Sequence, residues 1–271
     1  MSVSQLPPLL VEALETAAVN KTVRIAYSGG LDSRFLAFCA KLAGFNVVLL
    51  HIKGPHVAPI ETREALQLAE DMGLSVQIID LNPLDHIDLR ALGHDRCYAC
   101  KRLLFQTLLN RDPAVPLCDG SNASDTDVFR PGARAVKELG ILSPLALAGL
   151  TKHDIRQWGA KLGFPHPEQR ARPCLLTRFP YGTNVSAEQL RLIARAEAHV
   201  AAHPMGKRLA FRLRMPTPSL PELHVQADEV HDVSAEQLDA LIRDLKKAFP
   251  PLSGLRCVQL TILSGFYDKQ K

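Results

Sequence analysis

Two cysteines, Cys97 and Cys100, stand three residues apart in the segment HDRCYACKR, a spacing that suits shared chemistry. Such a pair can form a redox disulfide, provide half of a zinc site, or supply two thiolates to an iron–sulfur cluster. His94 precedes the pair and could complete a zinc site, because structural zinc usually takes four protein ligands. The surroundings lack the thioredoxin-like pattern in which such pairs form redox disulfides. From the residues alone, a cluster, zinc, a disulfide and metal-free thiols all stay open.

The loop AYSGGLDS, residues 26–33, offers a second kind of chemistry, because it joins an apolar run to a helical pattern. Its two glycines allow the backbone to approach a ligand closely, and consecutive amides at a helix start can surround an anion. Asp32 suits such a loop only if it caps the helix or helps to hold Mg²⁺ on phosphates. The loop matches neither the dinucleotide-binding motif nor the Walker motif. It therefore predicts a phosphate site of another kind.

The elements that position these residues alternate between strand and helix over the first 160 residues. Apolar, β-branched runs predict strands at 22–28, 46–52, 74–81 and 115–121, with a possible fifth strand at 141–147. Apolar residues at helical spacing predict helices at 32–44, 60–73, 97–111, 128–140 and 151–163. Thr151 and Asp154 match a capping box at the start of the last helix. This alternation predicts an α/β fold, a parallel sheet with helices on both faces.

The pattern changes after an irregular, proline-containing stretch at 163–184. Helices are then predicted at 186–202 and 234–249, and strands at 209–215, 220–227 and 255–263. These elements form a small α+β module, so we expect two domains, 1–184 and 185–271. The other three cysteines lie inside apolar elements and are expected to be core residues; they are Cys39, Cys118 and Cys257.

Composition and charge limit the class of protein. The chain has 271 residues, of which 46% are hydrophobic and 22% charged, a profile typical of a globular enzyme. No apolar run approaches the ~20 residues of a membrane span, and the N-terminal segment lacks a signal-peptide pattern. We therefore expect a cytoplasmic protein with reduced thiols and no membrane partner. The net charge of +4 is mild, and the basic clusters at 168–178 and 207–214 suit a small anionic ligand better than nucleic acid.

The string SGGLDS after an apolar strand resembles the signature of the PP-loop ATP pyrophosphatases. Further segments, in matching order and spacing, resemble one branch of that superfamily, the LarE-like ATP-dependent sulfur transferases. They are CDGSNASD (118–125), FRPGARAVKELGILSPL (129–145), LTKHDIRQWGAKLGFP (150–165), CLLTRFPYG (174–182) and RCVQLTILSGFY (256–267). Two motifs depart slightly from the branch, since its DGTN is DGSN here and its CLSSR is CLLTR.

The superfamily resemblance implies a Rossmann-like fold of the adenine nucleotide alpha hydrolase type that binds ATP and Mg²⁺. It also implies that ATP adenylates a substrate carboxylate with release of pyrophosphate. Asp32 would hold Mg²⁺ and act in catalysis, and the adenine would lie near Ile52 and the DGSN loop. The residues that the resemblance implies in nucleotide binding are Ala26, Ser28, Gly29, Gly30, Asp32, Ser33, Ile52, Asp119 and Asn122.

Cys174 matches the cysteine that is the sulfur centre of the LarE-like branch. Some members consume this cysteine as a sacrificial sulfur donor, whereas members with an added C-x-x-C pair hold a [4Fe–4S] cluster on three cysteines. The resemblance thus implies Cys97, Cys100 and Cys174 as metal ligands, with zinc as the competing metal. A cluster-based enzyme also needs a separate source of sulfide.

Members of the branch thiolate a carboxylated pyridinium mononucleotide on the route to a nickel-pincer cofactor, which implies a small anionic substrate here. Arg178, Arg212 and Arg214 are the candidates to hold its phosphate or carboxylates. The family tends to form homo-oligomers, so a homo-oligomer is a possible state. Two alternatives stay open: an enzyme of this type that thiolates a tRNA base or another metabolite, and a nucleotide-binding regulator without turnover.

Overall fold

The computed structural model describes residues 5–88, 93–125, 131–217, 220–227 and 233–268. The chain divides into two compact units, each of which is described by itself. The first comprises Met1–Gly54, Glu61–Ile87 and His94–Arg172, and the second comprises Pro55–Ile60, Asp88–Gly93 and Pro173–Lys271. The domain limits expected from the sequence, 1–184 and 185–271, stay a prediction.

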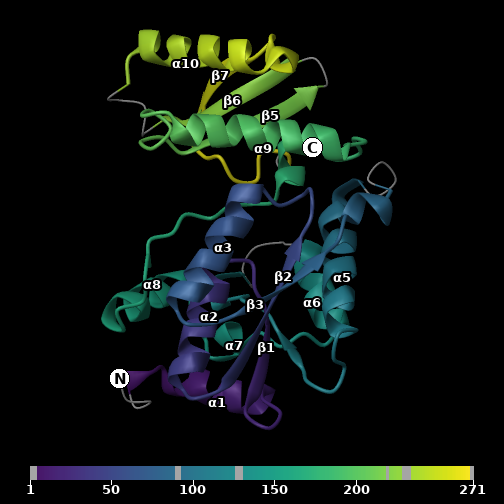
Figure 1. Cartoon of the computed structure of the whole chain (residues 1–271), viewed down its shortest axis with the longest axis vertical. Coiled ribbons are helices and arrows are strands. Elements are labelled where there is room, and N and C mark those ends of the chain that lie inside the picture. Colours follow the sequence, from purple (N-terminus) through teal and green to yellow (C-terminus); the bar gives the residue numbers. More distant parts are fainter. Residues whose placement is uncertain (1–4, 89–92, 126–130, 218–219, 228–232, 269–271) are drawn as a thin grey trace. The chain divides into compact units, whose positions relative to one another are not determined.

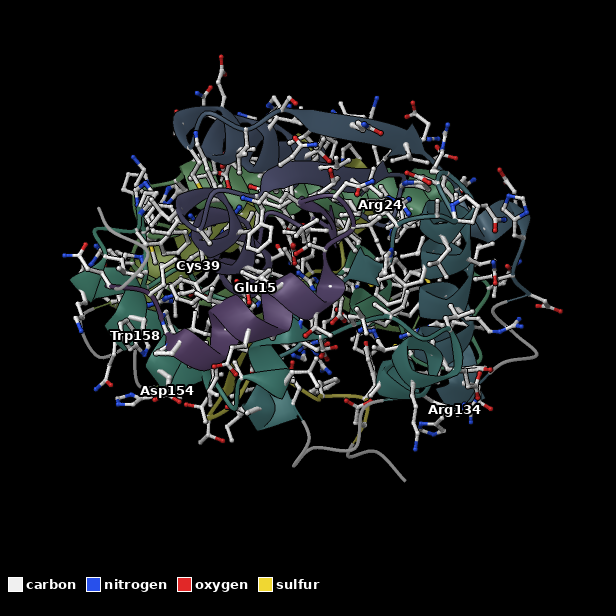
Figure 2. The ribbon with its side chains drawn as sticks, turned by 90° about the horizontal axis from the view of Figure 1, so that it is seen from below. Glu15, Arg24, Cys39, Arg134, Asp154 and Trp158 are labelled. Atoms are coloured by element: carbon white, nitrogen blue, oxygen red, sulfur yellow. The ribbon has the colours of Figure 1, made fainter. Side chains whose placement is uncertain are left out.

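A parallel four-stranded sheet forms the centre of the first unit (Figure 1). Its strands are β1 (Thr22–Ala26), β2 (Asn46–Lys53), β3 (Val76–Asp80) and β4 (Leu117–Cys118), in the spatial order β3-β2-β1-β4. The middle of β1 is buried on both faces, as an internal parallel strand requires. Even the buried Arg24, which is labelled in Figure 2, is satisfied there, because its guanidinium donates to the carbonyls of Leu108, Asp112 and Val115.

Helices cover both faces of this sheet, as the sequence pattern predicts. They are α1 (Pro8–Ala17), α2 (Leu31–Leu42), α3 (Pro59–Asp71), α5 (Arg96–Leu109), α6 (Pro131–Glu138), α7 (Pro144–Leu147) and α8 (Lys152–Lys161). One buried cluster joins Ile25 of β1 to residues of α1, α2, α3, α7 and α8. A second joins Leu50 of β2 and Leu117 of β4 to residues of α5 and α6. Two separate cores on one sheet confirm the α/β fold with helices on both faces.

Two local predictions for the first unit were incomplete or wrong. The apolar run at 141–147 is not a fifth strand, because only Leu142 makes an isolated parallel bridge, to Cys118, and α7 then begins at Pro144. Helix α1 was not predicted; it buries Leu10 and Leu14 in the first core cluster. The predicted capping box at the start of α8 is confirmed, with Thr151 and Asp154 bonded reciprocally.

The second unit contains a small sheet of three strands in the order β5-β6-β7. The strands are β5 (Phe211–Thr217), β6 (Leu220–Gln226) and β7 (Arg256–Leu260), and the helices are α9 (Ala187–Ala202) and α10 (Ala235–Ala248). Strands β5 and β6 pair antiparallel, and β6 and β7 pair parallel. Each helix begins with a capping box in which a serine and a glutamine bond reciprocally. Among the described helices of the chain, none is long and apolar enough to cross a membrane.

Candidate functional site

The glycine loop between β1 and α2 is held by its own serines and by close packing on α3. Ser33 Oγ donates to the Gly30 carbonyl at 3.2 Å and lies 3.1 Å from Ser28 Oγ, which accepts from the Gly30 amide at 3.2 Å. Gly29 has a φ of +74°, and a Cβ there would lie 2.3 Å from the Cβ of Ala65. Glycine is therefore required at this position both by conformation and by space.

A second loop, Asp119–Asn122 after β4, packs directly against the first turn of α2. A Cβ on Gly120 would lie 2.7 Å from the backbone nitrogen of Ser33. Because β1 connects to β2 on one side and β4 pairs on its other side, the order of strands reverses between β1 and β4. In open α/β sheets, ligands bind at the carboxyl ends of strands at such a switch point. The two loops predicted to bind ATP therefore lie together where this topology places ligands.

The side chains of the second loop are buried and bonded within the protein. Asp119 is 4% exposed and accepts from the amide and hydroxyl of Ser121 and, at 2.7 Å, from the hydroxyl of Ser143. Asn122 is 2% exposed, and its side-chain oxygen accepts from the Ser124 amide at 2.9 Å. These bonds shape the loop, so its backbone is the part suited to contact a ligand.

Asp32 has one carboxylate oxygen engaged and one available. Its Oδ2 lies 2.7 Å from Nζ of Lys152, whereas its Oδ1 is buried with no hydrogen-bond partner among the described residues. Asp32 does not cap α2, since Gly30 is the N-cap residue and the described structure has no side-chain cap there. A buried carboxylate oxygen without a partner is suited to a hard cation such as Mg²⁺.

Two groups that act on this loop were not predicted from the sequence. Lys152 begins α8 and follows its capping threonine, so its place at a helix start was visible, but its pairing with Asp32 was not. Arg34 is fully buried and donates to the carbonyls of Pro165 and His166, at 2.9 and 3.1 Å. It also binds the side chain of Gln169, whose amide donates to the Gly29 carbonyl at 3.1 Å. The irregular segment after α8 thus contacts and stabilises the glycine loop.

Ile52 and Ala26, the remaining predicted nucleotide contacts, also lie at the carboxyl edge of the sheet. Ala26 is the last residue of β1 and pairs with Leu50, and Ile52 lies two residues further along β2. Ile52 is half-buried beside the second core cluster. An apolar side chain at this edge is compatible with a purine ring, although its contact with adenine stays a prediction.

The C-x-x-C pair lies in the first two turns of α5. Cys97 is half-buried, Cys100 is 8% exposed, and neither forms a disulfide in the described structure. Residues three apart on a helix share a face, so both thiols can serve one ligand. Lys101 lies next to the pair, with Nζ 3.7 Å from Asp119 Oδ2, so α5 contacts the loop after β4.

A complete metal site is not assembled by the residues that the structure describes. Among them, no group of three or more His, Cys, Asp or Glu side chains is arranged to hold a metal ion. Cys97 and Cys100 belong to the first unit, and Cys174 belongs to the second. The three-cysteine site therefore stays a prediction, as does the zinc alternative that includes His94.

In the second unit, the three predicted substrate arginines lie in one electrostatic neighbourhood. Burial lowers the pKa of Arg214 to about 10, and the positive charges of Arg178 and Arg212 contribute to this decrease. Arg178 is 3% exposed and forms a bidentate pair with Glu197. Arg212 is half-buried on β5 and donates to the Phe211 carbonyl. Their contact with a substrate stays a prediction.

Arg214 takes part in a buried network of polar contacts. Its guanidinium bonds to His224 Nδ1 at 2.6 Å and to the Leu263 carbonyl, and His224 Nε2 lies 2.6 Å from Glu222. Burial and the charge of Arg214 lower the pKa of His224. His224 thus suits the neutral form, which accepts at Nδ1 from arginine and donates at Nε2 to glutamate.

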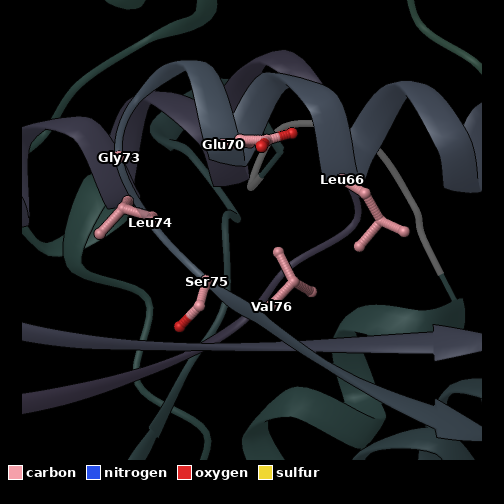
Figure 3. Close-up of a pocket in the computed structure, with 6 residues that line it drawn as sticks. All are labelled: Leu66, Glu70, Gly73, Leu74, Ser75 and Val76. Atoms are coloured by element: carbon pink, nitrogen blue, oxygen red, sulfur yellow. The ribbon is translucent and has the colours of Figure 1, made fainter.

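A hollow on the first unit lies elsewhere. It is lined by residues of the end of α3 and the start of β3 (Figure 3): Leu66, Glu70, Gly73, Leu74, Ser75 and Val76. This is the amino end of β3, whereas the two loops follow the carboxyl ends of β1 and β4. The hollow is therefore separate from the candidate site.

Comparison with known proteins gives three relatives, and no family model matches the chain. The chain is 36% identical to the uncharacterized protein slr1717 of Synechocystis over 180 residues, 65% of this chain and 67% of that protein. It is 31% identical to the uncharacterized protein MJ0830 of Methanocaldococcus jannaschii over 201 residues, 72% of this chain and 74% of that protein. It is also 28% identical to pyridinium-3,5-bisthiocarboxylic acid mononucleotide synthase of Lactiplantibacillus plantarum over 183 residues, 66% of each.

Proposed function

The chain belongs to the same family as slr1717 and MJ0830, and because it is also similar to the Lactiplantibacillus plantarum synthase, we propose that it is a sulfur-inserting enzyme of the LarE type. The observation that carries the proposal is the packing of Gly120 against Ser33, which joins the SGGLDS and DGSN loops at the switch point. The similarity to the Lactiplantibacillus plantarum synthase supports the kind of reaction, and the loops support a nucleotide as co-substrate.

In this proposal, ATP binds over the glycine loop in the manner of PP-loop enzymes. The amides of Ser28 to Gly30 and the start of α2 face its phosphates, and the adenine lies beside Ile52. The free Oδ1 of Asp32 would hold Mg²⁺, which would supply Lewis-acid stabilisation of phosphate charge. Lys152 then exchanges part of its pairing with Asp32 for a phosphate oxygen.

The reaction begins with adenylation of a substrate carboxylate. A carboxylate oxygen attacks the α-phosphorus of ATP, the bond to the β-phosphate oxygen breaks, and pyrophosphate leaves. This converts a poor leaving oxygen into AMP. A sulfur nucleophile then attacks the acyl carbon, AMP departs, and a thiocarboxylate remains. The protein supplies amides, Lys152 and arginines where negative charge develops, which lowers the barrier without covalent chemistry by those groups.

Cys174 is the proposed sulfur centre, and two versions of its role are distinguishable. In one, the Cys174 thiolate attacks the acyl carbon and AMP leaves, which gives a thioester. Loss of the Cα proton and cleavage of the Cβ–Sγ bond then release the thiocarboxylate and leave dehydroalanine at position 174. In the other, Cys174 joins Cys97 and Cys100 as ligands of a [4Fe–4S] cluster, and thiolates suit such a cluster. The three thiolates would hold the cluster, which would supply the sulfur for transfer, and a separate source of sulfide would replenish it. Zinc held with His94 is the competing metal.

The proposed substrate is a small carboxylated mononucleotide, by analogy with the printed name of the synthase. Its phosphate and carboxylates suit Arg212 and Arg214, which lie in a basic neighbourhood. A cytoplasmic, homo-oligomeric enzyme is part of the same proposal. If a tRNA or another metabolite supports turnover and the mononucleotide does not, the acceptor assigned here is wrong.

Anaerobic purification followed by two assays tests the proposal. Iron, sulfide and zinc are measured on the purified chain, and pyrophosphate release is measured with ATP, Mg²⁺ and a pyridinium carboxylate mononucleotide. Acceptor-dependent release of AMP and pyrophosphate supports the reaction, whereas ADP and phosphate would reject it. A protein that carries only zinc would reject the cluster.

Replacement of Cys97 by alanine separates the two sulfur roles. The cluster version predicts that Cys97→Ala loses iron and repeated sulfur transfer but keeps pyrophosphate release, since the nucleotide loops are unchanged. Cys257→Ala is the matched control, because Cys257 is a half-buried cysteine on β7 without an assigned role. Sulfur transfer by Cys97→Ala at the wild-type rate would instead favour sacrificial donation by Cys174.

A further inference from the structure

The contacts of Arg178 differ from those of a substrate-binding arginine. Its Nε and Nη2 donate to the two carboxylate oxygens of Glu197, at 2.7 and 3.0 Å. Its Nη1 donates to Thr177 Oγ1 at 2.8 Å and to the Pro173 carbonyl at 3.3 Å. All three nitrogens of the 3% exposed side chain are thus engaged within the second unit. A substrate carboxylate would have to displace Glu197 from the guanidinium fork.

The groups that Arg178 contacts hold the backbone on both sides of Cys174. The Pro173 carbonyl belongs to the peptide bond before Cys174 and accepts from Arg178. The Cys174 carbonyl belongs to the peptide bond after it and accepts from the amide and hydroxyl of Thr177, at 3.0 and 2.7 Å. Since Arg178 also donates to that hydroxyl, one guanidinium sets the orientation of both peptide groups.

The carboxylate partner of Arg178 and the backbone of Arg178 are also held in place. Glu197 lies on α9 and accepts from the Leu213 amide of β5 at 2.9 Å, in addition to its bonds with Arg178. The Arg178 carbonyl accepts from the hydroxyl of Tyr267 at 3.3 Å. The short helix that follows Cys174, Leu175–Arg178, is therefore linked to α9 and β5 through a buried ion pair. Removal of one partner of such a pair is strongly destabilising, because the other charge is left buried and unpaired.

We propose that Arg178 is a positioning residue that orients the backbone around Cys174, and that it does not bind the substrate. The inference rests on the sulfur role proposed for Cys174. It reassigns Arg178 among the three arginines expected to hold the substrate, and leaves Arg212 and Arg214 in that group. A donor or ligand thiol must be held in one place, because small displacements of reacting groups slow a reaction steeply.

Alkylation of Cys174 provides a readout that does not depend on turnover. In Arg178→Lys, the single ammonium cannot reproduce the fork with Glu197 and the bonds to Thr177 and Pro173. The half-buried thiol of Cys174 should then react severalfold faster with iodoacetamide, as followed by mass spectrometry. Sulfur transfer should fall by about tenfold to a hundredfold, while the KM for the substrate in pyrophosphate release stays unchanged.

Two controls separate local release from loss of the fold. Labelling of Cys257, a half-buried thiol in the same unit, should not change in Arg178→Lys. Arg256→Lys weakens another arginine–glutamate pair of this unit, that of Arg256 with Glu222, and should leave labelling of Cys174 as in the wild type. If Cys257 labelling rises in Arg178→Lys, Glu197→Gln decides: selective labelling of Cys174 supports the inference, and parallel labelling of both cysteines overturns it.

Other outcomes also contradict the inference. A wild-type labelling rate of Cys174 in Arg178→Lys would show that Arg178 does not hold the loop. Unchanged labelling with a raised KM for the substrate would restore Arg178 as a substrate ligand. Failure of the proposed function is distinguishable from both, because the wild-type enzyme itself would then release no acceptor-dependent pyrophosphate.

Discussion

Replacement of Gly29 by alanine tests whether the glycine loop packs on α3 as closely as the structure shows. The φ of +74° lies in the left-handed region, which costs an alanine about 1–2 kcal/mol. The new methyl would lie 2.3 Å from Ala65 Cβ and 2.9 Å from its Cα, and such overpacking costs a further ~1–3 kcal/mol. We therefore expect Gly29→Ala to lower the free energy of unfolding by about 2–5 kcal/mol.

Two further variants divide this loss between its causes. Gly44→Ala has a φ of +84° but meets no described atom within 4 Å, so it should lose only the conformational term of about 1–2 kcal/mol. Ala65→Gly removes the nearer clashing atom, so adding it to Gly29→Ala should recover part of the loss. The pair should therefore be coupled in a double-mutant cycle.

Denaturant unfolding of the full chain measures the free energies, and pyrophosphate release measures the loop's function. Gly29→Ala should weaken ATP binding as well as stability, whereas Gly44→Ala should bind ATP like the wild type. Equal destabilisation by Gly29→Ala and Gly44→Ala, with no coupling to Ala65→Gly, would refute the close approach of the loop to α3.

Three other substitutions give definite expectations. Lys152→Gln removes the partner of Asp32 and should slow ATP-dependent pyrophosphate release by about tenfold, or ~1.4 kcal/mol, measured with saturating acceptor; an unchanged rate would exclude Lys152 from the site. Gly120→Ala places a methyl 2.7 Å from the first turn of α2 and should raise the KM for ATP, and a wild-type KM would argue against contact between the two loops. His224 has a pKa lowered by burial from 6.5, so the native state binds fewer protons than the unfolded state and stability should fall as pH drops below about 6.5. Because the pKa of Glu222 is also lowered, its contribution is lost only at more acidic pH. His224→Gln should therefore reduce the thermal-melting slope between about pH 7 and 5.5, to which the buried His51 also contributes, and a slope equal to that of the wild type would contradict this assignment.

Local sequence signals predicted the parts of the fold that depend on neighbouring residues. The loop after β1, the capping box of α8 and the alternation of strands and helices follow from glycine conformation, capping chemistry and apolar spacing. Helix α1 was not predicted because its N-cap is Pro7, which offers no side-chain cap. The run at 141–147 looked like a strand, but Pro144 favours the first turn of a helix.

The missing parts of the site are contacts between residues far apart in the chain. Lys152 pairs with Asp32 across 120 positions, and Arg34 binds Gln169 across 135. No local pattern encodes such pairs, because they depend on how the elements pack. The same reason explains why the pair of Arg178 with Glu197 was not predicted: an arginine in a motif indicates an anion, and only the fold shows that a carboxylate of the chain contacts it.

The most direct test of the account combines product analysis with nucleotide analysis in one reaction. The purified wild-type chain is incubated anaerobically with ATP, Mg²⁺, sulfide and a pyridinium carboxylate mononucleotide, and the products are measured by mass spectrometry. We expect a thiocarboxylate, in which sulfur has replaced a carboxylate oxygen, formed in equal amount with AMP and pyrophosphate. An unmodified acceptor, or ATP converted to ADP and phosphate, would contradict it.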